Sequence, residues 1–263
     1  MNAAASLFSG LLFACGTAGA QVPESGRAQE LSFSAEEVAS TVEDRYIDRV
    51  VELAAAGRLD DDRALLARLQ TIGAGLIRAA VALKPEAAAW QWEFHTTSDT
   101  EVDAICMAGG KILVGSAFVR QLALSDGELA TLLGHEVAHA VAEHHRETLS
   151  EALFLNRYPA VPLEVVLERL ESDLSVQIRL SKLSSLQESE ADQLGMVLAH
   201  RAGWPAADMV GFYRKLSDGD QLALVAGAYP ASASRLSMAK GMALLFQADK
   251  FGVKSDIRTR AVP

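Results

Sequence analysis

The spacing of apolar and polar positions predicts a mostly helical chain. "SAEE" at residues 34–37 places a serine three residues before a glutamate, which is a capping box, and an apolar-periodic run follows to about residue 56. "SDGE" at residues 125–128 is a second capping box and opens another helix. The same periodicity, with glycine or proline near the ends, predicts further helices over residues 59–83, 162–180, 183–201, 205–216 and 233–247.

Short alternating segments replace the helical pattern between residues 90 and 115. "WQWEFHTT", "VDAICM" and "GGKILVG" are typical of strands, and we expect a small antiparallel sheet. The predicted fold class is therefore α+β, with one mostly helical domain over residues 34–263. Residues 21–33 are polar and are expected to form a flexible linker in front of it.

The first twenty residues carry no charge and have a short apolar centre followed by small residues. This pattern is typical of a secretory signal peptide over residues 1–20, cut before Gln21. "LFAC" at residues 12–15 supports a second interpretation, a lipoprotein leader in which Cys15 becomes the lipidated first residue. Both interpretations predict a protein outside the cytoplasm, and the second adds association with a membrane.

Composition excludes one class of partner. The chain has 263 residues, of which 50% are hydrophobic, and 24 lysines and arginines stand against 34 aspartates and glutamates. A net charge of -10 argues against nucleic-acid binding through a basic surface. The composition is that of a globular protein with a sizeable core.

The candidate chemistry lies in "LLGHEVAHAVAEHH" at residues 132–145. His135, Glu136 and His139 form an HExxH motif. On a helix the two histidines lie one turn apart and about 40° from each other, so that both rings can bind one cation. Glu136 is turned about 100° from His135, where it can act as a base on a metal-bound water.

Two residues compete to be the third ligand. His145 has the offset of the last histidine in the metzincin pattern HExxHxxGxxH, but that pattern needs a glycine where this chain has Ala142. Because alanine favours helix, we expect the helix to continue and to carry His145 about 15 Å along the axis from His135, with His144 on the opposite face. His145 is then expected to be solvated and His144 to have a structural role.

The other candidate is Glu188 in "LQESEADQLG". A carboxylate from a second helix completes a His, His, Glu zinc site with an open fourth position. Asp192 lies one turn from Glu188 and can accept the second ring N–H of His135 or His139. Glu190 points away from that face and is interpreted as a solvated or ion-paired carboxylate.

These segments resemble peptidase family M48, the gluzincin metallopeptidases that include the HtpX heat-shock proteases and the CAAX prenyl endopeptidases. "LLGHEVAHAVAEH" is similar to the family's HExxH helix, "QESEADQLG" to its ExEAD motif, and "VDAICMAGGKILV" to the strand before the helix. The resemblance implies a zincin-like domain with one zinc on His135, His139 and Glu188, and Glu136 as general base. It also implies that substrate pairs with an edge strand formed by Gly109, Gly110, Lys111, Ile112, Leu113 and Val114.

One departure from the family is in "AYPASASR" at residues 228–235, where Tyr229 replaces a histidine of the family. A phenol can donate a hydrogen bond to an oxyanion, so Tyr229 is a candidate catalytic residue, with packing of its ring as the alternative. Arg235 is expected to orient this loop or a substrate carbonyl. The short form resembles periplasmic members of the family.

The resemblance therefore implies a zinc endopeptidase acting on misfolded or unassembled envelope proteins, with polypeptides as partners. A zinc-containing chaperone or binding module with little proteolytic activity is the alternative.

Overall fold

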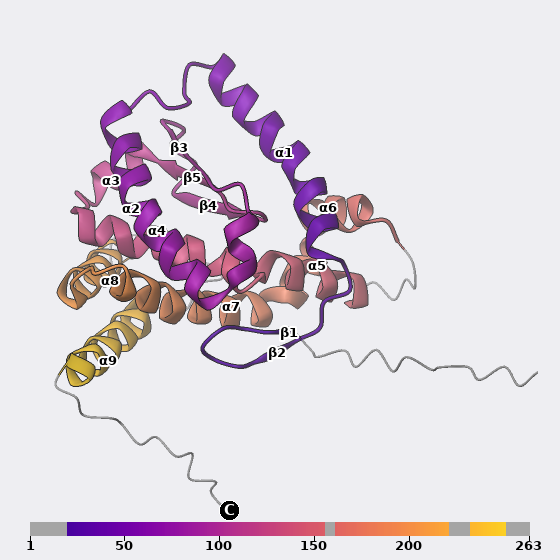
Figure 1. Cartoon of the computed structure of the whole chain (residues 1–263). Helices are drawn as coiled ribbons and strands as arrows, with labels where there is room; N and C mark the ends of the chain where they lie inside the picture. Colours follow the sequence, from indigo (N-terminus) through magenta and orange to yellow (C-terminus); the bar gives the residue numbers. More distant parts are fainter. Residues whose placement is uncertain (1–19, 156–160, 221–231, 251–263) are drawn as a thin grey trace, which may run out of the picture.

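The computed structural model describes residues 20–155, 161–220 and 232–250, and most of these are helical (Figure 1). The α+β fold class is confirmed. The helices are α1 (Ala35–Ala55), α2 (Arg63–Leu83), α3 (Ser116–Gln121), α4 (Asp126–Val141), α5 (His144–Leu155), α6 (Leu163–Ser172), α7 (Leu174–Arg201), α8 (Ala206–Asp220) and α9 (Ser232–Lys250), with a 3-10 turn at Pro85–Ala89. The strands are β1 (Ala20–Gln21), β2 (Ala28–Gln29), β3 (Glu93–Thr97), β4 (Ala104–Met107) and β5 (Lys111–Gly115).

Both predicted capping boxes lie at helix starts, with both reciprocal bonds at Ser125 and the serine bond at Ser34. The Ser34 hydroxyl accepts the N–H of Glu37 at 3.1 Å at the start of α1. At the start of α4, the Ser125 N–H donates to the Glu128 carboxylate at 2.8 Å while the Ser125 hydroxyl accepts the Glu128 N–H. These bonds satisfy N–H groups that have no partner within the helix, which fixes where α4 starts.

The three-stranded sheet differs from the expectation in two ways. Its order is β3-β5-β4, with β3 parallel and β4 antiparallel to β5, so the sheet is mixed. The strand at residues 109–114 is therefore the central one, and the prediction that it is a free edge is wrong. Every residue of β5 is buried, as expected of a strand with neighbours on both sides. The edge nearest to α4 is β4.

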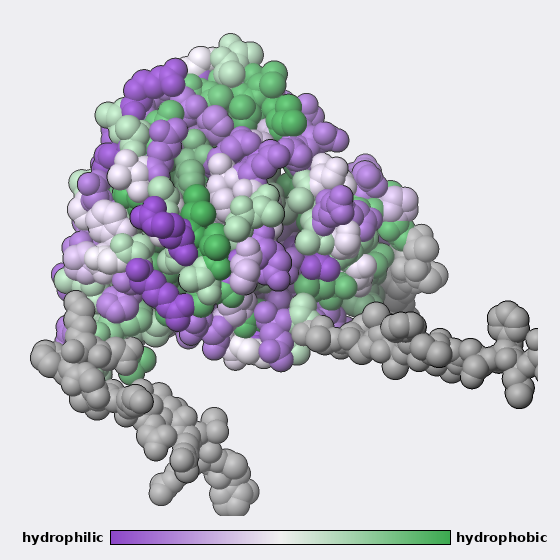
Figure 2. All heavy atoms as spheres, in the orientation of Figure 1, coloured by the Kyte–Doolittle hydropathy of each residue, from purple (hydrophilic) through white to green (hydrophobic). Residues whose placement is uncertain are grey.

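The sheet lies between α1 and the α2/α4 side of the molecule (Figure 1). On one face Leu53 of α1 forms a small core with Val102 and Leu113. On the other face Ile112 and Val114 belong to the main core, which they share with α2, α4, α7 and α8. The outer side of α1 leaves apolar side chains at the surface (Figure 2), among them Ile47 and Val51.

Helices α4 and α7 form the centre of the molecule. They approach so closely that a Cβ atom on Gly195 would lie 2.7 Å from the backbone nitrogen of His135, and one on Gly134 would lie 2.7 Å from the Gly195 carbonyl oxygen. Glycine at both positions is therefore what allows the HExxH helix to lie against the helix that carries Glu188. By length and composition α2 could cross a membrane, but it buries one face in the same core.

The segment before α1 differs from the predicted linker. Strands β1 and β2 pair as a short antiparallel hairpin, with Ala20 opposite Gln29, and Val22 is only 1% exposed. The hairpin is fixed to the domain by ion pairs that Arg27 makes with Glu147 and Glu190. The predicted leader covers residues 1–20. Residues 1–19 lie outside the described residues, and Ala20 belongs to β1.

Two helix boundaries also differ from the expectation. The predicted helix over residues 162–180 is divided at Asp173, whose side chain accepts the N–H of Ser175 and caps α7. The helix that carries Glu188 thus starts at Leu174 and runs on to Arg201. At the other boundary, α4 ends at Val141 instead of continuing through Ala142, because Glu143 has a left-handed backbone with φ of 53°.

Candidate metal centre

His135, His139 and Glu188 come together where α4 crosses α7. One ligand atom from each lies within 4.8 Å of the others. The Nε2 atoms of the two histidines are 3.0 Å apart, and the Glu188 carboxylate oxygens lie 3.3 Å from His135 Nε2 and 3.5 Å from His139 Nε2. The helical spacing within α4 and the close contact with α7 produce this convergence.

The donor set fits a metal ion. Glu188 Oε2 is buried and has no hydrogen-bond partner among the described residues. A buried carboxylate oxygen without a partner is costly, and two imidazole nitrogens that face each other cannot both carry a hydrogen. A cation bound by both nitrogens and the carboxylate would use all three lone pairs. Two histidines and one glutamate, with room for a water, are a common catalytic zinc set.

Glu136 is also buried, with 7% of its surface exposed. Burial raises the pKa of its carboxyl to about 7, although the nearby His135 and the backbone N–H of Cys106 act in the opposite direction. The side chain thus lies beneath β4. A carboxylate whose pKa is close to neutral can accept a proton and later release it.

Asp192 binds the back of His135. Its Oδ1 lies 2.9 Å from His135 Nδ1 and accepts the Tyr213 hydroxyl at 2.9 Å. Burial raises the pKa of Asp192, but the hydrogen bonds from His135 and Arg235 outweigh this effect and leave the pKa below its usual value. The carboxylate therefore stays ionised and holds His135 with Nε2 directed toward the other ligands.

Arg235 pairs with Asp192, a contact that the sequence did not predict. Its Nε and Nη2 donate to the two oxygens of Asp192 at 2.7 and 2.6 Å, and its guanidinium lies over the Tyr213 ring. The loop before Arg235 lies outside the described residues, so the predicted role of Arg235 toward the loop or a substrate carbonyl stays a prediction. Tyr229 lies outside the described residues, so its predicted role stays a prediction.

The helix break at Glu143 changes the positions of the last two histidines. His144 is only 2% exposed, and its Nδ1 lies 3.0 Å from the Nδ1 of His139, so the expectation that it points to the opposite face is wrong. His145 is not in the ligand group, but it is not solvated either. Its Nε2 is buried, and burial lowers its pKa.

Sequence reasoning missed two residues that support the ligands, Arg27 and Tyr213. Arg27 donates from Nε to Glu190 at 2.7 Å, and this pair together with His144 lowers the pKa of Glu190 to about 2 in spite of burial. Tyr213 reaches Asp192 from α8. No sequence pattern indicates the role of Arg27 or of Tyr213. A structural role was expected for His144, but its contact with His139 depends on the helix end at Glu143, which the residues there do not indicate.

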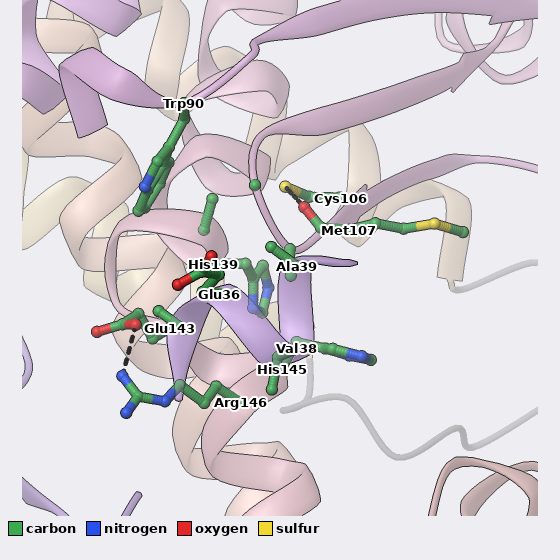
Figure 3. A pocket seen from close by; sticks show the side chains of 14 residues that line it. Glu36, Val38, Ala39, Trp90, Cys106, Met107, His139, Glu143, His145 and Arg146 are labelled. Carbon is green, nitrogen blue, oxygen red and sulfur yellow. Dashed lines mark hydrogen bonds and ion pairs between the residues drawn. The ribbon is translucent and has the colours of Figure 1, made fainter. Parts of the chain in front are cut away.

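A cavity of about 280 Å³ lies beside His139. Figure 3 shows Trp90 on one side of it and Cys106 and Met107 on the other, with Glu143 and Arg146 paired below His139. Other walls come from the start of α1, including Val38 and Ala39. The cavity is thus mostly apolar and connects the end of β4 with the ligand group.

An HExxH helix, a carboxylate from a second helix and a strand edge above them define a metallopeptidase-like domain. The chain belongs to peptidase family M48, whose family model matches residues 64–243. The resemblance found in the motifs is thereby confirmed. The matched region includes the whole ligand group but neither the N-terminal hairpin nor α1.

Curated relatives show the same relationship. The mitochondrial metalloendopeptidase OMA1 of Arabidopsis thaliana is 32% identical over 146 residues, which cover 55% of this chain and 30% of that protein. The OMA1 of Saccharomyces cerevisiae is 28% identical over 131 residues, covering 49% and 38%. A beta-barrel assembly-enhancing protease of Yersinia pestis is 25% identical over 183 residues, covering 64% and 36%. The chain spans about a third of the length of these relatives.

Proposed function

We propose that this protein is a zinc-dependent endopeptidase that holds one zinc per chain on His135, His139 and Glu188. The observation that carries the proposal is the convergence of three ligand atoms within 4.8 Å, next to the buried Glu136 of the same helix. A structural zinc site needs four protein ligands, whereas three leave a position for water.

Glu136 is the proposed general base. When bound, zinc supplies a Lewis acid that lowers the pKa of a water and polarises the scissile carbonyl. Glu136 accepts a proton from the attacking water and delivers it to the leaving amine nitrogen. Its burial beside the ligand group supports this role, because the carboxylate is held on the same helix as His135 and His139 and next to them. Tyr229 is proposed to donate a hydrogen bond to the oxyanion.

The substrate is proposed to lie extended along β4 instead of β5. The Gly115 N–H donates to the Asp103 carbonyl at 2.8 Å. Since bonding to the partner alternates along an antiparallel strand, Ala104 and Cys106 turn their backbone groups away from β5. A polypeptide can pair by β-augmentation with the backbone groups of Ala104 and the carbonyl of Cys106, while the Cys106 N–H is directed toward Glu136. The neighbouring cavity can then take an apolar side chain of the substrate.

Misfolded or unassembled envelope proteins are the proposed substrates, and an extracytoplasmic compartment is the proposed location. The support for the substrate class is the family resemblance and the name of the Yersinia relative, a beta-barrel assembly-enhancing protease. The support for the location is the pattern of residues 1–20. Cell fractionation tests whether the protein is exported. A Cys15→Ala variant that loses membrane association would indicate a lipoprotein leader, and an unchanged distribution would indicate a signal peptide.

The experiment for the activity compares two buried acids of the same helix. We expect the purified protein to cleave unfolded casein, and Glu136→Gln to lower kcat/KM by about 10²–10⁴ while one zinc per chain is retained. Glu128→Gln, at the far end of α4, is the matched control and should keep its activity. Equal activity of Glu136→Gln and wild type would overturn the mechanism.

The alternative function, a zinc-containing chaperone or binding module, predicts a different result. The protein would bind zinc and suppress aggregation of unfolded casein without cleaving it, and Glu136→Gln would behave like wild type in both respects. A buried carboxylate of raised pKa next to the ligand group favours the enzyme, because a binding module has no use for a base there.

A further inference from the structure

Arg27 belongs to the N-terminal hairpin, outside the region matched by the family model, yet it reaches two buried carboxylates. Its Nη1 and Nη2 donate to the oxygens of Glu147 at 2.5 and 2.8 Å, and its Nε and Nη2 donate to those of Glu190 at 2.7 and 2.8 Å. The side chains of Glu147 and Glu190 are only 7% and 9% exposed. Two such carboxylates repel each other strongly unless a cation lies between them. Arg27 therefore fixes α5 and α7 relative to each other.

The polar groups around this pair are satisfied. Glu147 Oε2 also accepts the side-chain amides of Gln29 and Gln187 at 3.0 and 2.9 Å. Gln187 directly precedes the proposed ligand Glu188. A buried network in which every member has a partner fixes one conformation, so the hairpin holds this part of α7 in place.

The network continues to the metal centre through His144. Glu190 Oε2 lies 3.4 Å from His144 Nε2, which is ion-pair distance without hydrogen-bond geometry, and His144 Nδ1 lies 3.0 Å from His139 Nδ1. A carboxylate beside Nε2 favours the form of His144 with its hydrogen on Nε2, which leaves Nδ1 as an acceptor. His139 must then donate from Nδ1, and the lone pair on its Nε2 points toward His135 and Glu188.

We propose that Arg27 is a positioning residue for His139, acting through Glu190 and His144, so that the N-terminal hairpin is part of the metal centre. The proposal rests on the proposed function in one respect, the assignment of His139 as a ligand. Arg27 is not catalytic, because it touches neither the ligand group nor the substrate strand. Outer partners that orient a histidine ligand usually contribute to metal affinity.

The chain contains a matched ion pair for comparison. Arg201, the last residue of α7, donates to Glu24 of the same hairpin at 2.8 Å, and both side chains are more than 40% exposed. Loss of this pair also loosens the hairpin, but among the described residues neither side chain forms a hydrogen bond or ion pair with His144 or Glu190. A general effect of hairpin attachment should therefore appear in both variants, and a positioning effect only in one.

The experiment measures the zinc affinity of the full chain by competition with a chromophoric chelator. We expect Arg27→Met to lower the affinity about tenfold and Arg201→Met to stay within about twofold of wild type. Equal affinities of Arg27→Met and wild type, or equal losses in the two variants, would overturn the proposal. If the wild-type chain bound no zinc, the proposed function would be wrong. If the wild type bound zinc and Arg27→Met bound it equally well, only the positioning role of Arg27 would be wrong.

A double-mutant cycle tests the path itself. In a His144→Asn background the connection to His139 is already cut, so Arg27→Met should then cause no further loss of zinc affinity. A full tenfold loss in that background would show that Arg27 acts by another route. If Arg27→Met does not fold, Glu190→Gln takes its place in the cycle, because the amide keeps the shape of the carboxylate without its charge.

Discussion

The two histidines of the HExxH motif are one helical turn apart, but different parts of the molecule support them. His135 contacts the carboxylate of Asp192 directly, and Asp192 is held in turn by residues of α8 and α9. His139 contacts a second imidazole, His144, and its support passes to Arg27 in the N-terminal hairpin. The side chain of His135 is 9% exposed and that of His139 is 20% exposed.

The difference shows that the two histidines of one short motif can be oriented by separate groups of residues. Support for His135 comes from helices within the region that the family model matches. Support for His139 comes from a helix break and from a segment before that region. We therefore expect changes on the His135 side to have the larger effects, with remote sites on the same helices as controls.

The largest effect is expected for Asp192→Asn. The change removes the anion that orients His135 and that pairs with Arg235, whose side chain is 12% exposed. We expect zinc affinity to fall by about 10–100-fold and the free energy of unfolding by about 3–5 kcal/mol. Chelator competition and urea unfolding measure the two quantities.

Asp126→Asn is the control for this change, because Asp126 also pairs with an arginine, Arg68, but at the surface with 59% of its side chain exposed. We expect it to cost less than about 1 kcal/mol and to leave zinc affinity unchanged. An Asp192→Asn protein that binds zinc as tightly as wild type would show that His135 needs no such partner.

The next largest effect is expected for Gly195→Ala, which acts on both histidines together. The added Cβ would lie 2.7 Å from the backbone nitrogen of His135, so α4 and α7 must move apart. We expect a loss of about 1–3 kcal/mol in the free energy of unfolding, together with weaker zinc binding. Gly241→Ala in α9, where no atom lies within 4 Å of the new Cβ, should be neutral or stabilising by up to about 1 kcal/mol.

The smallest effect is expected for Glu128→Gln at the start of α4, remote from both histidines. Burial raises the pKa of Glu128, but the hydrogen bonds from Lys215 and from the Ser125 N–H outweigh it and lower the pKa. Because the folded-state pKa is depressed, Glu128 stabilises the fold above its ordinary pKa of about 4.3. This contribution is lost as the pH falls through the folded-state value.

We therefore expect Glu128→Gln to cost about 1 kcal/mol at pH 7, because glutamine can still accept the Ser125 N–H but has no negative charge to pair with Lys215 or to interact with the helix dipole. The cost should become progressively smaller as the pH falls below about 4.3. Urea unfolding of both proteins over this pH range is the measurement. Zinc affinity near neutral pH should be the same in both. A difference that grows toward acid pH would mean that the sign of the pKa shift is wrong.

The parts of the site that follow from local chemistry could be predicted from the sequence. The capping box of Ser125 and Glu128 marks the start of α4, and the spacing of His135 and His139 places both on one face. Glu188 and Asp192 share a helix face because they are also four residues apart. Each of these relations involves residues within one turn of a helix, so they hold wherever that helix lies.

The remaining features depend on contacts between distant segments. Glu143 adopts a left-handed backbone although it is a good helix former, and its carboxylate is held by Lys84 from the end of α2 and by Arg146. No local pattern indicates this break, and His144 contacts His139 because of it. The central position of β5 had a signal, the uninterrupted apolar run of Ile112, Leu113 and Val114, which is typical of a strand with neighbours on both sides.

The measurement that tests the central claim most directly is the zinc content of two variants, Glu188→Ala and His145→Ala, after dialysis against metal-free buffer. The ligand group of His135, His139 and Glu188 predicts one zinc per chain in wild type and in His145→Ala, and loss of zinc in Glu188→Ala. Zinc retained by Glu188→Ala and lost from His145→Ala would contradict the proposed metal centre.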